Sequence, residues 1–181
     1  MANAGYEVYQ YDHTINKLPI ENKKFHWKKI GLTGGTESHE MKRIGTLITE
    51  NGHDKDQGMV LKCDIEGYEW EVFDNISDED LCRFDQIVLE MHACNDMNHK
   101  NDKIRVLKKL NKYFDVIHIH GNNVVPVSYC GELNLPSCIE ITYVKRGGFK
   151  TVEDGEHFLP IPLDQPCADR YPEMRLGNWN V

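Results

Sequence analysis

Acidic and imidazole side chains follow two short apolar runs of the sequence, at positions where a strand would end. Asp64 and Glu66 come directly after the run 59–63, and the run 86–90 ends at Glu90 and leads into Met91 and His92. Glu90 and His92 are two residues apart, so they share a face if the strand stays extended. A carboxylate or a neutral imidazole can remove a proton from a bound hydroxyl compound. The pattern therefore predicts Asp64, Glu66 and His92 as catalytic residues.

Two histidines further along the chain extend this group toward a metal site. His118 and His120 also stand two apart at the end of an apolar run. Together with Asp64 and His92, His120 would give a mixed oxygen and nitrogen ligand set for a divalent metal such as Mg²⁺. A His-x-His pair on a strand is also common without any metal, so both interpretations stay open. Glu140 either faces the same region or pairs with one of the two histidines.

Each of these side chains also has a purely structural interpretation. Asp64 could cap a helix that starts near Gly67, and Glu66 would then lie in its first turn, where the helix dipole favours a negative charge. His92 could be a buried histidine that bonds to a backbone carbonyl.

The elements that must position these residues alternate between short apolar runs and helical patterns. Such alternation is typical of an α/β sheet with crossover helices, in which ligands bind at the carboxyl ends of the strands. We expect a mostly parallel sheet with an antiparallel last strand. The strands are expected at 6–11, 24–30, 59–63, 86–90, 115–120 and 138–145, and the helices at 41–50, at about 67–76 and at 100–112.

The chain divides into two parts by composition. Residues 1–148 carry the alternating pattern and form the predicted α/β domain. Residues 149–181 are rich in Pro and Asp. Prolines favour turns and extended segments. We therefore expect an extended tail packed on the domain, without new secondary structure.

The composition of the 181 residues argues against several classes of partner. Lys and Arg total 21 and Asp and Glu total 29, which gives a net charge of 21 − 29 = −8. A nucleic-acid surface needs clustered cations, and a membrane span needs roughly 18 consecutive apolar residues, so neither partner is expected. No charged leader with an apolar core opens the chain. The six cysteines form no C-x-x-C pair. A reduced, cytoplasmic protein is the expectation.

The stretch from Val60 to Val72 reads V-L-K-C-D-I-E-G-Y-E-W-E-V. It resembles the K-x-D-x-E-G-x-E-W-E pattern of the FkbM-like methyltransferases, in the subgroup that includes the eukaryotic methyltransferase-like proteins. Other segments resemble the family in the same order: residues 7–12 its V-Y-x-F-D strand, 26–32 its H-K-I-G-L strand, 87–92 its L-E-x-H strand, and then 121–123, 138–144 and 159–162.

The resemblance implies a three-layer, Rossmann-like class I methyltransferase fold that binds S-adenosylmethionine (SAM). It implies that Asp12 binds the ribose hydroxyls of SAM, that His13 lies beside it, and that Asp64 lies near the transferred methyl group. His13 stands where the subgroup usually has Pro. A turn or helix-capping role for Asp12 remains the alternative.

One part of the family pattern is not matched. Family members carry a strand and a Gly-containing turn before the strand that matches residues 7–12, so we expect the first strand to be missing. Gly34 and Gly35 follow the wrong strand to replace that turn. The missing strand would lie between the strands that end at Asp12 and Asp64. Either those two strands pair directly, or self-association or a partner segment fills the gap, or the sequence is part of a longer product.

The function implied is transfer of a methyl group from SAM to a hydroxyl oxygen of a sugar or a small metabolite. Aligning the two reactants would supply much of the rate. Two alternatives remain: a non-catalytic or truncated methyltransferase-fold binding module, and a metal-dependent hydrolase that uses Asp64, His92 and His120.

Overall fold

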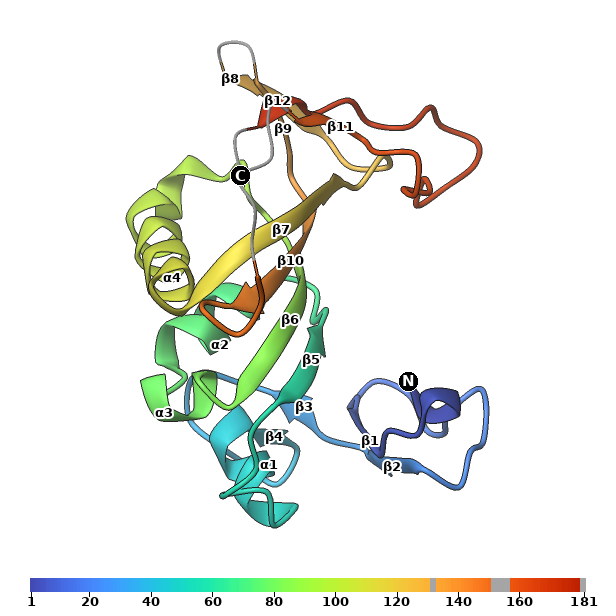
Figure 1. The fold of residues 1–181 in the computed structure, drawn as a ribbon, viewed down its shortest axis with the longest axis vertical. Helices are drawn as coiled ribbons and strands as arrows, with labels where there is room; N and C mark the ends of the chain where they lie inside the picture. Colours follow the sequence, from blue (N-terminus) through green and yellow to red (C-terminus); the bar gives the residue numbers. More distant parts are fainter. Residues whose placement is uncertain (131–132, 151–156, 180–181) are drawn as a thin grey trace.

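Strands and helices alternate along the chain in the computed structural model, which describes residues 1–130, 133–150 and 157–179 (Figure 1). None of the helices in these ranges is both long enough and apolar enough to cross a bilayer. The helices are α1 (Ile44–Glu50), α2 (Glu69–Asn75), α3 (Asp78–Leu81) and α4 (Lys100–Tyr113), with short 3₁₀ turns η1 (Ala2–Ala4) and η2 (Met97–His99). The strands are β1 (Val8–Tyr11), β2 (Phe25–Lys28), β3 (Gly31–Leu32), β4 (Met41–Lys42), β5 (Met59–Cys63), β6 (Phe84–Met91), β7 (Phe114–Gly121), β8 (Val127–Cys130), β9 (Leu133–Pro136), β10 (Ile139–Lys145), β11 (His157–Leu159) and β12 (Gly177–Trp179).

The main sheet has four strands in the order β5-β6-β10-β7. β5 and β6 pair in parallel, and β10 pairs antiparallel with both β6 and β7. The strands β5, β6 and β7 therefore run in one direction, and their carboxyl ends meet at one edge. The strand expected at 138–145 is β10, and it is antiparallel as predicted. It lies inside the sheet, so two of the three pairings are antiparallel, and the expectation of a mostly parallel sheet is wrong for the main sheet.

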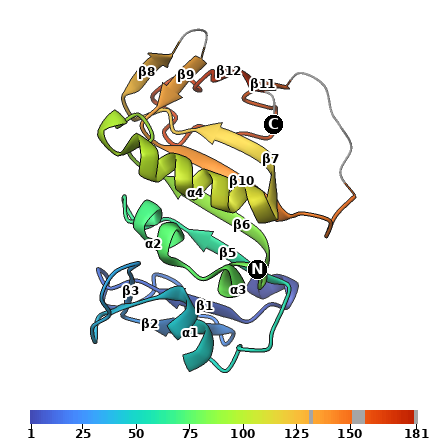
Figure 2. The same cartoon turned by 90° about the vertical axis from the view of Figure 1, so that its left-hand side faces the viewer.

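One face of this sheet carries the core. Alternate residues of β6 are buried, among them Ile87, Leu89 and Met91, because side chains of a strand alternate between its faces. They form one hydrophobic cluster with Phe73 of α2 and with Val106 and Leu110 of α4. Figure 2 shows α2 and α4 together on this side of the sheet. The chain is therefore a mixed α/β fold with a helical layer on this face.

β1 and β2 form a separate parallel pair. They contact the end of α1, where Asn51 donates a hydrogen bond to the hydroxyl of Tyr11 and the ring of His53 meets Tyr9 edge-on. The described strands β1 and β5 belong to different sheets, so the direct pairing that we considered for the strands ending at Asp12 and Asp64 does not occur.

Most predicted elements are present, with shifted ends. β5 occupies residues 59–63 as predicted, and the helix expected at 100–112 is α4. The pairs β3–β4, β8–β9 and β11–β12 and the helix α3 were not predicted. The tail is thus not free of secondary structure, since β11 pairs with β12. Leu159 and Leu176 of the tail pack in a cluster with Ile119 and Ile139 of the main sheet.

Candidate functional site

Polar side chains gather at the carboxyl edge of the main sheet, where β5 and β6 end. The carboxylate of Glu90, on β6, accepts hydrogen bonds at its Oε1 from Asn122 Nδ2 and Cys138 Sγ, each at 3.2 Å. Asn122 follows β7 and Cys138 precedes β10. Side chains from three strand ends therefore meet at Glu90.

A buried glutamate at the start of α2 orients His92. The side chain of Glu69 has no exposed surface, and its Oε1 lies 3.1 Å from Nδ1 of His92. Since a carboxylate only accepts, Nδ1 is the donor, and Nε2 is left as the basic nitrogen. Nε2 lies 3.5 Å from Oε2 of the exposed Glu66. The backbone carbonyl of His92 accepts a hydrogen bond from Trp70 Nε1 at 2.6 Å, which fixes the residue further.

The same glutamate organises the loop between β5 and α2. Glu66 and Gly67 have positive φ angles of 56° and 106°, and a left-handed conformation is costly for a residue other than glycine. Glu69 supports this turn because its carboxylate accepts hydrogen bonds from the backbone N–H of Ile65 at 2.9 Å and of Gly67 at 3.1 Å. The cap position of α2 is Tyr68, without a capping side-chain bond. The interpretation of Asp64 as the helix cap is therefore wrong.

Asp64 instead forms a carboxyl pair with Glu90. Burial raises the pKa of Asp64, and a hydrogen bond with Glu90 and the charge of Glu90 raise it further. Burial opposes the ionised form of Glu90 as well, but hydrogen bonds from Cys138, Asp64 and Asn122 keep its pKa below the usual value. Two carboxyl groups that interact in this way do not ionise independently. Of the two, Asp64 is the one whose charged form is disfavoured.

Asp12 and His13 lie apart from this cluster. Asp12 follows β1, and its Oδ1 accepts hydrogen bonds from the backbone N–H and the hydroxyl of Thr14, at 2.7 and 2.6 Å. These bonds hold the pKa of Asp12 below its usual value. The exposed His13 lies against Gly31 at the start of β3. Figure 1 shows β1 and β2 set to one side of β5. Asp12 thus makes the local contacts expected for a turn residue, which was the alternative to ribose binding. Its carboxylate is ionised.

The structure does not bring Asp64, His92 and His120 together as one ligand set. Among the described residues, Asp64 and His92 group with Glu69, whereas His120 groups with Glu140 and Cys167. β10 lies between β6 and β7, so β7 is two strand spacings, roughly 10 Å, from β6. The other expectation for Glu140 is confirmed: its Oε2 lies 2.9 Å from Nδ1 of His120.

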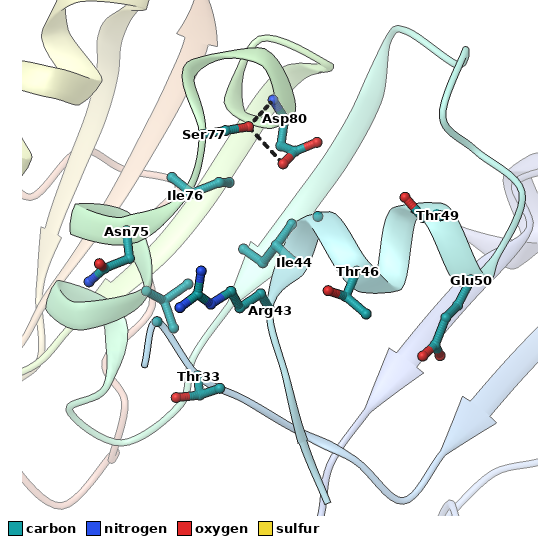
Figure 3. A pocket seen from close by; sticks show the side chains of 13 residues that line it. Thr33, Arg43, Ile44, Thr46, Thr49, Glu50, Asn75, Ile76, Ser77 and Asp80 are labelled. Carbon is teal, nitrogen blue, oxygen red and sulfur yellow. Dashed lines mark hydrogen bonds between the residues drawn. The ribbon is translucent and has the colours of Figure 1, made fainter. Parts of the chain in front are cut away.

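A cavity of about 450 Å³ opens elsewhere, between α1, α2 and α3 (Figure 3). Its lining includes Thr33, Arg43 and Asp80, and none of the predicted site residues. A Cβ at Gly34 would come within 2.1 Å of the backbone oxygen of Glu71. Close packing of the turn at Gly34 against α2 therefore explains why this position is a glycine. We place the candidate site at the carboxyl cluster, where ionisable groups converge, and not in this cavity.

Sequence reasoning missed Glu69, which holds both His92 and the turn at Gly67. Glu69 is part of the K-x-D-x-E-G-x-E-W-E pattern, two residues after Gly67. The spacing of a motif does not predict that a glutamate is buried. Cys138 was likewise noted only as a scattered cysteine, although its thiol donates to Glu90.

Comparisons with known proteins identify the family of the chain. The sequence model named "Methyltransferase FkbM domain" matches residues 4–115, a range that contains Asp12, Asp64, Glu69 and His92. "Probable methyltransferase-like protein 24" of Homo sapiens is 28% identical over 103 residues, and that of Rattus norvegicus is 27% identical over the same length. The alignments cover 51% of this chain and 28% of each relative, so the chain spans well under half of their length. No solved structure gives a match.

Proposed function

The chain belongs to the FkbM methyltransferase domain family, and we propose that it transfers a methyl group from SAM to a hydroxyl oxygen of a sugar or a small metabolite. The observation that carries this proposal is the pairing of His92 with the buried Glu69 beside the Asp64–Glu90 carboxyl pair. These four residues lie at the carboxyl edge of the sheet, where open α/β folds bind their ligands.

The residues of this edge fit the charge of the proposed cofactor. SAM carries a sulfonium and an ammonium group and, when bound, supplies an electrophilic methyl group. Four carboxyl groups gather here, those of Asp64, Glu66, Glu69 and Glu90. Among the described residues, none of the four forms an ion pair with Lys or Arg, and such a group of carboxylates attracts a cation. Asp64, at the end of β5, would face the cofactor.

Asp12 fits the ribose of the cofactor. A carboxylate that accepts hydrogen bonds from two hydroxyl groups must be ionised, and the bonds from Thr14 keep Asp12 so. Because Asp12 follows β1 and Asp64 follows β5, which belong to different sheets, the cofactor would extend from one group of strands to the other. In this proposal the fold is the three-layer, Rossmann-like arrangement of class I methyltransferases, to which β1–β2 and β5–β7 would contribute parts.

His92 would act as the general base for the acceptor. Glu69 holds the Nδ1 proton, so Nε2 faces outward toward Glu66 and can take the hydroxyl proton. The negative charge of Glu69 stabilises the imidazolium that forms. Glu66, with its side chain 87% exposed, can accept a hydrogen bond from another hydroxyl group of a sugar acceptor.

A non-catalytic binding module is the second candidate, because one observation favours it. Asp12 and Asp64 lie on two sheets that do not pair within the described residues. A chain in which these two carboxylates are not held at a fixed distance would bind SAM weakly or not at all.

Calorimetric titration of SAM and of S-adenosylhomocysteine into the purified chain, with and without Mg²⁺, tests the proposal. We expect one binding site, and we expect Asp12→Ala to weaken it about tenfold or more, because a hydrogen bond to a charged group is lost. Asp56→Ala, at an exposed turn, is the matched control and should bind as the unaltered chain does. A well-folded chain without detectable binding would favour the non-catalytic module.

A further inference from the structure

A second polar cluster surrounds His120 of β7, next to the proposed site, since Glu140 of β10 pairs with His120 on one side and with Glu90 on the other. His120 is only 5% exposed. Its Nδ1 lies 2.9 Å from Oε2 of Glu140, its cross-strand neighbour on β10, and its Nε2 lies 3.1 Å from Oε1 of Glu173 in the tail. The ligand atoms of His120, Glu140 and Cys167 all lie within 4.8 Å of one another.

The tail segment that supplies Cys167 and Glu173 is held in place by Asn123. Its Oδ1 accepts a hydrogen bond from the backbone N–H of Ala168 at 3.1 Å. Its Nδ2 donates to the backbone carbonyls of Ala168 at 3.0 Å and Tyr171 at 3.1 Å. The two tail residues are therefore presented to His120 on a segment with a defined position, as a binding site requires.

The cluster has more negative than positive groups. Within the described ranges, the ion pairs of Glu140 and of Glu173 are both with His120. Oε2 of Glu173 is buried and has no hydrogen-bond partner there. A buried carboxylate oxygen without a partner is costly, so a further group that interacts with it would be stabilising.

The two other groups of possible ligands are already committed to protein contacts. Glu69 accepts two backbone N–H groups as well as His92, and Cys138 donates its thiol hydrogen to Glu90. The thiol of Cys167, in contrast, is on an exposed residue. Imidazole, carboxylate and thiolate within this distance form a donor set that suits zinc in particular.

We propose that His120, Glu140 and Cys167 bind one Zn²⁺ ion. Nδ1 of His120, a carboxylate oxygen of Glu140 and the sulfur of Cys167 are the ligands. Binding displaces the Nδ1 proton and the thiol proton, and both go to solvent. Glu173 continues to accept from Nε2–H and orients the ring, which is the usual arrangement around a zinc-bound histidine. The ion joins the tail to β7 and β10.

Zinc titration of the chain, stripped of metal and free of a histidine tag, tests this site by competition with a chromophoric chelator. We expect one equivalent of Zn²⁺. Cobalt in its place should show the charge-transfer absorption of a thiolate ligand. Cys167→Ser should remove that absorption, and Glu173→Gln should weaken binding about 10- to 100-fold through the orientation of His120. Both variants change side chains at the tail, and circular dichroism checks that they fold.

The matched control is Cys82→Ser, which alters a cysteine outside all three groups and should bind zinc with a thiolate signal like the unaltered chain. Absence of stoichiometric zinc in the folded chain would overturn the proposal. So would tight binding that persists in Cys167→Ser together with Glu173→Gln, since the ion would then lie elsewhere.

Discussion

Oε1 of Glu69 and Nδ1 of His92 lie 3.1 Å apart, across 23 residues of sequence, and the glutamate has no exposed surface. The contact joins the first residue of α2 to the residue after β6. It fixes the imidazole tautomer, and it also ties the turn at Glu66 and Gly67 to the helix, because the same carboxylate accepts from the turn. Orientation of the base and shape of the loop therefore depend on one side chain.

Glu69→Gln should separate these two roles. The amide oxygen still accepts, so the chain should fold, with a loss of about 1–3 kcal/mol of unfolding free energy from weakened bonds to Ile65 and Gly67. Without the negative charge, both His92 tautomers should be populated. The ¹⁵N NMR shifts of the imidazole nitrogens would measure this. His92→Asn should lower the methylation rate by on the order of 10²-fold. Glu71→Gln, on the exposed side of α2, is the control. An unchanged His92 tautomer in Glu69→Gln would contradict this assignment.

Asp64→Asn should weaken SAM binding without destabilising the chain. Burial and Glu90 raise the pKa of Asp64 in the folded state. For a carboxyl group whose folded pKa is raised, the stability present at low pH is lost as the pH rises through that pKa. Asn carries no charge and donates to Glu90 at every pH. The melting temperature of the variant should therefore equal or exceed that of the unaltered chain at pH 7, with a smaller difference near pH 4. A large loss of stability at pH 7 would show that the charge of Asp64 is needed for folding.

Much of the fold was predictable because single segments carry their own signal. An apolar run predicted β5, and helical spacing predicted α4. The common direction of the strands predicted that Asp64 and His92 lie at the same edge of the sheet. The helix α3 has four residues and β3 has two, which is too short for any periodicity. The tail strands β11 and β12 pair with each other across 17 residues, and nothing local in either segment predicts that pairing.

The errors at the site come from strand order and burial. Asp64 and His92 follow strands and His120 lies near the end of one, so sequence reasoning grouped them. The structure inserts β10 between β6 and β7, and His120 meets Glu140 instead. Glu69 was overlooked since a glutamate in a first helical turn is normally on the surface. Its burial is possible only because backbone N–H groups and His92 surround the carboxylate.

The helices α2 and α4 are joined by an ion pair that should weaken in acid. Arg105 donates two hydrogen bonds to Asp74, at 2.7 and 2.6 Å, and the bonds from Arg105 lower the pKa of Asp74 against the effect of burial. A lowered pKa gives stability that is present above the unfolded value and is lost as the pH falls through the folded one. A double-mutant cycle of Arg105→Ala and Asp74→Ala should give a coupling of about 0.2–1 kcal/mol at pH 7 and less near pH 3, measured by urea unfolding. Equal coupling at both pH values would contradict the ion-pair assignment.

The outer edge of β5 should make the chain self-associate. β5 pairs with β6 on one side, and the described residues place no strand on the other. Val60 on this strand is 41% exposed. An unpaired apolar edge offers its N–H and C=O groups to another chain, and a charged side chain on the edge opposes such pairing. Light scattering after size exclusion should therefore give a mass that rises with concentration, and Val60→Lys should lower it. Ile104 of α4 is 38% exposed, and Ile104→Lys should leave the concentration dependence of the mass unchanged. If the unaltered chain stays monomeric at all concentrations, this edge does not pair in solution.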